Sequence, residues 1–218
     1  INVLTRNGND VTIPQKQTCC GALHVHAGDR ETGKKLAMQN IEAFSDSEKI
    51  IVNAAGCGCM LKEYPELFRE DPVMHDKAVE FANKVEDISK HLYDTGYEEP
   101  KGEIKTRITY HDACHLAHGQ GVRKEPRELL LKIPGVEMVH MPNADRCCGS
   151  AGVYNITNPE MASAVLESKM QNVPEDVEMI SMGNPGCMLQ MAIGVQKYGR
   201  SQKVVHTVQL LDWAYKKE

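Results

Sequence analysis

The chain has 218 residues, 41% of them hydrophobic and 25% charged, which is the composition of a folded globular protein and excludes a disordered chain or a small disulfide-stapled peptide. Its 25 basic and 30 acidic residues leave a formal net charge of −5, which argues against the polycationic surface that nucleic-acid binding needs. No apolar run reaches the roughly 20 residues of a membrane-spanning helix and the first residues are not a signal peptide, so we expect no transmembrane segment.

The first half of the chain alternates short strand patterns with helix patterns. Asp71-Pro72 starts a helix, because Asp caps a helix and Pro is tolerated at its first position. Apolar residues at steps of three and four then continue this helix to Leu92. The expected elements are strands at 10–13 and 49–53, helices at 31–44 and from 72 to 92, and a linker at 94–101 that contains Gly96 and Pro100.

The second half alternates strands and helices more regularly. Pro134-Gly135 ends one helix, and Asn158-Pro159 supplies the capping and first residues of the next. The expected strands are 105–110, 136–141, 177–181 and 203–207, and the expected helices are 125–131, 159–170 and 188–198. Strands that alternate with helices at this spacing predict a mostly parallel α/β sheet.

The eight cysteines lie mainly in the loops that follow these strands. They are Cys19, Cys20, Cys57, Cys59, Cys114, Cys147, Cys148 and Cys187. The carboxyl ends of parallel strands meet at one edge of a sheet, where helix N-termini also point inward. We therefore expect the four cysteines of the second half, distant in sequence, to meet at one edge.

The cysteine pattern favours metal binding over disulfides. Disulfide frameworks are typical of short secreted chains, and adjacent cysteines can bridge each other only with backbone strain. Vicinal cysteines suit an iron–sulfur cluster, because each can bind a different iron of the same cluster. Two adjacent cysteines fit the tetrahedral geometry of a single zinc ion less well. Zinc remains the alternative.

Two cysteine motifs repeat at one separation. Cys19-Cys20-Gly21 and Cys147-Cys148-Gly149 are 128 residues apart, and the tetrapeptide GCML at 58–61 recurs at 186–189 with the same separation. This pattern predicts a duplicated unit with no net insertion between the two motifs, and we place the units at 1–98 and 99–218. Cys114 has no counterpart in the first unit, so we expect a fragment of a longer protein whose first site lacks one wall and binds metal less tightly.

Four motifs carry a family resemblance across nearly the whole chain. The pattern C-x(32)-CCG-x(37)-C resembles the cysteine-rich CCG domain of heterodisulfide reductases and their relatives. Within that superfamily, the chain resembles the iron–sulfur subunits of glycolate oxidase (glycolate dehydrogenase). The motifs are CCGALHVHAGD at 19–29, YHDACHLAHGQ at 110–120, PNADRCCGSAGVYN at 142–155 and GNPGC at 183–187.

The resemblance implies two tandem CCG units, each a small, mostly parallel sheet flanked by helices, with the cysteine loops at the carboxyl ends of the strands. It implies one [4Fe–4S] cluster on a second site of Cys114, Cys147, Cys148 and Cys187, and Cys19, Cys20, Cys57 and Cys59 as candidates for a first site, where zinc or no metal is the alternative. Each unit has four cysteines where the full motif has five. In the second unit Asn184 stands in place of one cysteine of the last loop, whereas the first unit has Cys57-Gly58-Cys59 in that loop and no counterpart of Cys114.

The resemblance also implies partners. A flavoprotein subunit that carries FAD oxidises the hydroxy acid, and this chain passes electrons to the membrane quinone pool or another acceptor without being catalytic alone. We expect a cytoplasmic protein, with peripheral association at the inner membrane face left open. A zinc-stabilised docking scaffold, and CCG subunits of lactate, glycerol-3-phosphate or heterodisulfide oxidoreductases, are the alternatives.

Histidines and one arginine surround the cysteine motifs. These side chains could be metal ligands or proton carriers, or they could be hydrogen-bonding groups that orient the loops. We favour the hydrogen-bonding role, because thiolates suffice as the ligands of a cluster. A cation before the second cysteine pair could stabilise a reduced cluster or form a surface ion pair. The residues are His24, His26, His111, His115, His118 and Arg146, with Asn184 in the same supporting role.

Overall fold

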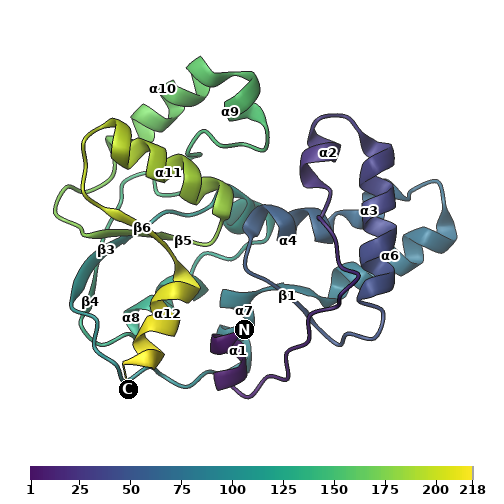
Figure 1. The fold of residues 1–218 in the computed structure, drawn as a ribbon, viewed down its shortest axis with the longest axis horizontal. Helices are drawn as coiled ribbons and strands as arrows, with labels where there is room; N and C mark the ends of the chain where they lie inside the picture. Colours follow the sequence, from purple (N-terminus) through teal and green to yellow (C-terminus); the bar gives the residue numbers. More distant parts are fainter. Residues whose placement is uncertain (218) are drawn as a thin grey trace.

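The computed structural model describes residues 1–217, which form two α/β lobes lying side by side (Figure 1). All strand pairs among these residues are parallel, as two sheets with the orders β1-β2 and β4-β3-β5-β6. The two sheets and their flanking helices confirm the predicted α/β class. The cysteine loops of the second half leave the carboxyl ends of β3, β4 and β5, so the fold supplies the convergence expected there from the sequence.

The first lobe is built on the two-stranded sheet. Its elements are α1 (Asn2–Arg6), α2 (Ala22–His26), α3 (Arg30–Ala43), β1 (Ile50–Val52), α4 (Ala55–Lys62), α5 (Tyr64–Leu67), α6 (Pro72–Lys84), β2 (Val85–Asp87) and α7 (Ile88–Thr95). Asp29 and Asp71 cap α3 and α6 by accepting backbone N–H groups with their side chains. The interior of this lobe is apolar, and the rings of Tyr64 and Phe81 stack at its centre.

The second lobe is built on the four-stranded sheet. Its elements are β3 (Thr106–Tyr110), the π-helix η1 (His115–Gly119), α8 (Glu125–Leu131), β4 (Val136–Val139), α9 (Tyr154–Thr157), α10 (Pro159–Met170), β5 (Met179–Met182), α11 (Pro185–Lys197), β6 (Lys203–His206) and α12 (Thr207–Lys216). Ile108 packs with α8 and α12 in one hydrophobic cluster, and Ile180 packs with α10 and α11 in another. Helices therefore cover both faces of the sheet, as buried parallel sheets require.

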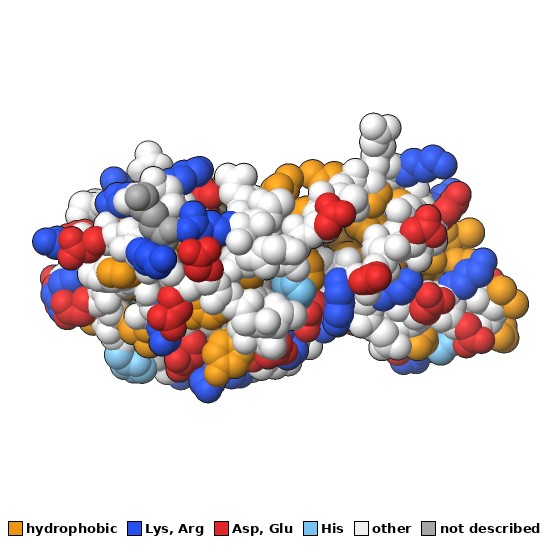
Figure 2. Space-filling view, turned by 90° about the horizontal axis from the view of Figure 1, so that it is seen from below, with side chains coloured by type: hydrophobic (Ala, Val, Ile, Leu, Met, Phe, Trp, Pro, Cys, Tyr) orange, Lys and Arg blue, Asp and Glu red, His pale blue; other side chains and the backbone are white. Residues whose placement is uncertain are grey.

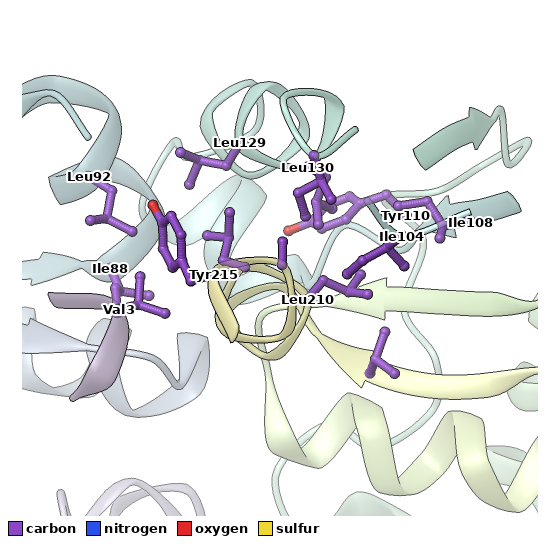
Figure 3. Packing of buried hydrophobic residues seen from close by; sticks show 14 of the residues in the cluster. Val3, Ile88, Leu92, Ile104, Ile108, Tyr110, Leu129, Leu130, Leu210 and Tyr215 are labelled. Carbon is purple, nitrogen blue, oxygen red and sulfur yellow. The ribbon is translucent and has the colours of Figure 1, made fainter. Parts of the chain in front are cut away.

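The interior crosses the predicted boundary at residue 98. Val3 and Leu4 of α1 and Ile88 and Leu92 of α7 pack with the strands and helices of the second lobe (Figure 3). The side chain of His206, at the end of β6, contacts the Asn53 carbonyl at 2.7 Å. The lobes thus share a core, and α4 lies between them in Figure 1.

Two expected elements of the first half are wrong. Residues 8–20 form an irregular loop instead of a strand at 10–13, and Ile13 is 57% exposed, so neither a neighbouring strand nor the core holds this segment extended. The helix expected from 72 to 92 is interrupted by β2, because Val85–Asp87 pair with β1 from Ile50 to Val52. Tertiary pairing with β1 overrides the helical periodicity there.

None of the helices in residues 1–217 combines the length and apolar character needed to cross a membrane. Acidic and basic side chains intermingle over the face shown in Figure 2, where no single-sign patch dominates.

Candidate metal centre

Three loops bring the four cysteines of the second half together. Cys114 directly precedes η1 after β3, the pair Cys147-Cys148 lies in the loop after β4, and Cys187 is the third residue of α11 after β5. These strands are adjacent in the sheet, so their loops meet at its carboxyl edge. Cys148 and Cys187 are buried, whereas Cys114 and Cys147 are partly exposed.

Hydrogen bonds among these thiols separate their pKa values. A hydrogen bond with Cys147 raises the pKa of Cys114, and bonds from Cys114 and Cys148 lower the pKa of Cys147. A hydrogen bond from Cys148 lowers the pKa of Cys187 to about 4, while bonds with Cys147 and Cys187, together with burial, raise the pKa of Cys148. The four thiols thus form a chain of neighbours in the order Cys114, Cys147, Cys148 and Cys187, and two of them favour the thiolate form that binds metals.

Donors from the loops point at the sulfur atoms. The Gly149 N–H donates to Cys147 Sγ at 3.3 Å, and Asn184 Nδ2 donates to Cys187 Sγ at 3.3 Å. Gly149 has a φ of +93°, and a Cβ there would lie 2.5 Å from the Ala162 carbonyl oxygen, so only glycine fits this turn. Hydrogen bonds to sulfur stabilise thiolates and tune the potential of a bound cluster.

A histidine and a lysine complete the surroundings of the second site. A ring nitrogen of His111 and the sulfur atoms of Cys148 and Cys187 all lie within 4.8 Å of one another. Because Nδ1 of this ring bonds the Ala144 carbonyl, the nitrogen that faces the sulfurs is Nε2. The Lys169 ammonium donates to the carbonyls of Asn143 and Ala144 at 2.9 and 2.8 Å, and burial lowers its pKa to about 8. The sequence interpretation missed Lys169, although helical spacing from Leu166 and Ala162 places it on the buried face of α10.

The first site brings together three thiols. A hydrogen bond from Cys20 lowers the pKa of Cys57 to about 7, and the same bond and burial raise the pKa of Cys20. Cys19 is exposed and adds charge near Cys57, and its Sγ accepts the Gly21 N–H at 3.5 Å. The CCG turns of the two sites therefore match, since Gly21 and Gly149 both have positive φ and bond the first sulfur of their pair.

Cys59 points away from this group. Its thiol donates to Glu63 Oε1 at 3.4 Å, and a Cβ on Gly119 of η1 would lie 2.6 Å from its sulfur. Burial and the charge of Glu63 raise its pKa to about 11, and no cysteine is among the causes.

The structural counterpart of Cys187 is Cys57 rather than Cys59. Each is the third residue of its helix, α4 or α11, and each pairs with the second cysteine of its CCG motif. The repeated GCML tetrapeptide is therefore two residues out of structural register, and the expectation of no net insertion between the motifs is wrong. The physical reason is that α4 begins at Ala55 and α11 at Pro185.

The remaining predicted residues lie around the two sites. His115 Nδ1 is 3.5 Å from Cys114 Sγ, and the ring of His26 lies 6.3 Å from that of His115. The other two histidines have polar partners on the surface, His24 with Asp29 and His118 with Arg123 and Asp145. Arg146 is exposed beside the second cysteine pair.

Comparisons with known proteins identify the family of the chain. Residues 1–62 and 108–192 match the family described as CCG, cysteine-rich domain. The chain belongs to the CCG cysteine-rich domain family. The two matched segments correspond to the two lobes that hold the cysteine loops, and the resemblance inferred from the motifs is confirmed.

Individual CCG relatives are also similar over nearly the whole chain. The probable glycolate oxidase iron-sulfur subunit of Bacillus subtilis (strain 168) is 43% identical over 97% of this chain, which spans about half (49%) of that relative. Lactate utilization protein A of Oceanobacillus iheyensis is 35% identical over 97% of this chain and 88% of its own length. Lactate utilization protein A of Bacillus subtilis (strain 168) is 29% identical over 97% of this chain.

The donor set of the second site fits an iron–sulfur cluster. Four thiols, each a neighbour of the next, come from three loops, and N–H groups are directed at the sulfur atoms of Cys147 and Cys187. The Nε2 atom of His111 is buried beside them and, within residues 1–217, has no hydrogen-bond partner. An unpartnered buried nitrogen among thiols is typical of a metal-binding site.

Proposed function

We propose that this chain is an iron–sulfur subunit of an oxidoreductase complex that passes electrons from a flavoprotein partner to a further acceptor. The observation that carries the proposal is the convergence of Cys114, Cys147, Cys148 and Cys187, with sulfur-directed donors in place. The names of the relatives, glycolate oxidase and lactate utilization, support a 2-hydroxy acid as the substrate of the whole complex. FAD would lie on the partner, and a membrane quinone is one candidate acceptor.

Different residues of the second site would have different roles in electron transfer. The four thiolates of the second site would hold a [4Fe–4S] cluster, which supplies a reversible one-electron carrier. The N–H groups of Gly149 and Asn184 stabilise charge on the sulfur atoms, and the buried ammonium of Lys169 adds a positive charge nearby. Buried Cys148 and Cys187 face the interior, while partly exposed Cys114 and Cys147 form the side through which electrons would enter or leave.

A zinc-stabilised docking scaffold is the second candidate. The grouping of His111 Nε2 with the sulfurs of Cys148 and Cys187 favours it, because mixed nitrogen and sulfur ligands are common for zinc. Such a protein would bind the flavoprotein without accepting its electrons.

Anaerobic purification decides between the two candidates. Iron, acid-labile sulfide and zinc are assayed in the wild-type chain and in Cys148→Ser, with Cys59→Ser as the matched control outside both thiol groups. We expect iron, sulfide and an EPR signal on reduction in wild type and in Cys59→Ser, and loss of the second site's share of all three in Cys148→Ser. Stoichiometric zinc without sulfide would contradict electron transfer and support the scaffold.

We also propose that the two sites differ in affinity. Among the described residues the first site joins three thiols, whereas the second joins four thiols and an imidazole. More donors and deeper burial slow metal release. After chelator treatment, Cys20→Ser should retain most of its metal and Cys148→Ser should lose most of it; equal loss would contradict the proposal.

A further inference from the structure

His111 is held rigidly at the second site. Its ring is fully buried, its backbone N–H donates to the Ser181 carbonyl at 2.9 Å, and its Nδ1 lies 3.1 Å from the Ala144 carbonyl oxygen. The other ring nitrogen, Nε2, is buried and has no hydrogen-bond partner in the part of the chain that the structure describes. A buried polar atom is rarely left unpaired, because its lost hydration is not replaced, so Nε2 calls for an explanation.

The hydrogen bond at Nδ1 determines which nitrogen carries the proton. A carbonyl oxygen only accepts hydrogen bonds, so Nδ1 must be protonated. The same oxygen also accepts from Lys169 Nζ at 2.8 Å and from the Asp112 N–H at 3.0 Å. In the neutral ring with its proton on Nδ1, Nε2 presents a lone pair.

This lone pair faces two sulfur atoms. Nε2 and the sulfurs of Cys148 and Cys187 lie within 4.8 Å of one another. Cysteines must lose their protons to bind a metal, so in the loaded protein neither sulfur can donate a hydrogen to Nε2. A metal cation among these three atoms would be bound by the lone pair and both thiolates, which makes the arrangement favourable.

We propose that His111 Nε2 is a direct ligand of the metal centre at the second site, so that the site is a mixed thiolate–imidazole site. The proposal deepens the proposed function and rests on it only for the identity of the metal group. Five donors would then face a cluster whose four irons each take one protein ligand, so the imidazole would replace one of the four thiolates. Replacing a thiolate by a neutral imidazole at an iron raises the reduction potential, because the oxidised state loses an anionic ligand. His111 would thus set the second site apart from an all-thiolate cluster.

The test uses the full chain labelled with [¹⁵N]histidine, prepared anaerobically and reduced to a paramagnetic state. Pulsed EPR then measures the nitrogen coupling to the cluster. His111→Asn is the main variant, because Asn can keep the hydrogen bond to Ala144 while lacking Nε2. His115→Asn is the matched control, since His115 is the other histidine near these thiols, 3.5 Å from Cys114 Sγ.

We expect a strong coupling in wild type and in His115→Asn, and its loss in His111→Asn while iron and sulfide are retained. Absence of a strong coupling in wild type, its loss in His115→Asn, or its persistence in His111→Asn would overturn the proposal. Should His111→Asn not fold, wild type and His115→Asn still decide, because the coupling must then be present in both.

A second arm separates this inference from the proposed function. If the purified protein holds no acid-labile sulfide, iron–sulfur electron transfer is wrong, and Co²⁺ becomes the probe of the metal-free, reduced chain. A ligated His111 should give a paramagnetically shifted Nδ1–H proton resonance in NMR spectra, present in His115→Asn and lost in His111→Asn. Failure of Co²⁺ to bind, or binding without this resonance, would overturn the imidazole ligand as well.

Discussion

Asn184 Oδ1 accepts a hydrogen bond from the backbone N–H of Gly56 at 3.1 Å, across the two lobes. Gly56 directly precedes Cys57 of the first site, while Asn184 Nδ2 donates to Cys187 of the second site at 3.3 Å. One amide side chain thus contacts the cysteine helices of both sites. The Ala55 N–H also donates to the Gly183 carbonyl at 3.1 Å, so the N-terminus of α4 is docked on the loop before α11.

Removing this link should weaken both the fold and the second site. Asn184→Ala loses two hydrogen bonds, one of them to a thiolate, and we expect a loss of roughly 1–3 kcal/mol in the free energy of unfolding, with faster release of metal. Denaturant titration of the reduced, metal-free protein measures the first effect, and chelator kinetics measure the second. Asn2→Ala, which removes one exposed hydrogen bond to Asp212, should change neither by a comparable amount.

Cys57 and Cys59 should behave differently although they are two residues apart. Cys57 contacts Cys20, whereas Cys59 bonds to Glu63. We expect Cys57→Ser to lose metal from the first site and Cys59→Ser to keep it, as measured by metal content in a Cys148→Ser background. A protein that loses its first-site metal only on replacement of Cys59 would show that the register assigned to α4 is wrong.

Gly149 should be intolerant of a side chain. Gly149→Ala places a Cβ 2.5 Å from the Ala162 carbonyl oxygen at a φ of +93°, and we expect a loss of about 2–4 kcal/mol in the free energy of unfolding together with the second site's metal. Gly199→Ala is the control, because its φ of +62° imposes only the backbone penalty and nothing lies within 4 Å of the added atom. It should cost about 1 kcal/mol and keep the metal.

The buried carboxyl group of Asp87 should make the stability of the protein depend on pH. Burial raises the pKa of its carboxyl to about 6, and the side chain caps α7 by accepting the Ser89 N–H at 2.8 Å. A pKa raised by folding means that ionisation opposes the fold, so this contribution to stability is complete below about pH 4 and lost as the pH rises through 6. Asp87→Asn keeps the cap without the charge.

We therefore expect the free energy of unfolding of Asp87→Asn to equal that of wild type near pH 4 and to exceed it by about 3 kcal/mol at pH 7. Denaturant unfolding of both proteins at several pH values between 4 and 7 measures the difference in the free energy of unfolding. Titratable groups that both proteins share contribute equally to the two values and cancel in this difference. A gain that is independent of pH would show that the carboxylate is not the cause.

Lys169 should influence the redox centre more than Arg146 does. The lysine is buried near the second site, with its charge near Cys148 and Cys187, whereas the arginine is exposed to solvent that screens its charge. We expect Lys169→Met to lower the reduction potential by roughly 60 mV, a tenfold change in the electron equilibrium, and Arg146→Met to lower it much less. Redox titration followed by EPR measures both, and an equal shift would contradict the difference in burial.

Local patterns were sufficient for much of the fold. The expected strand at 105–110 is β3, the helix at 125–131 is α8, and the helix at 159–170 is α10. Capping residues, prolines and apolar spacing act within a few residues, so the sequence alone determines these elements. It also placed the four cysteines of the second half at strand ends, and a parallel sheet then brings adjacent strand ends together.

The tertiary structure decided what local patterns leave open. Val85–Asp87 continue the apolar spacing of a helix but pair with β1, because a strand edge from a distant segment offers hydrogen bonds that periodicity cannot reveal. Cys57 replaces Cys59 as the partner of Cys20, because the helix start rather than the repeated tetrapeptide sets which thiol faces the loop. Lys169 and His111 both hydrogen-bond to the carbonyl oxygen of Ala144, which holds their side chains beside the second site. Ala144 is far from Lys169 in the chain. Contacts of this kind depend on the packing of separate segments, which the order of residues does not display.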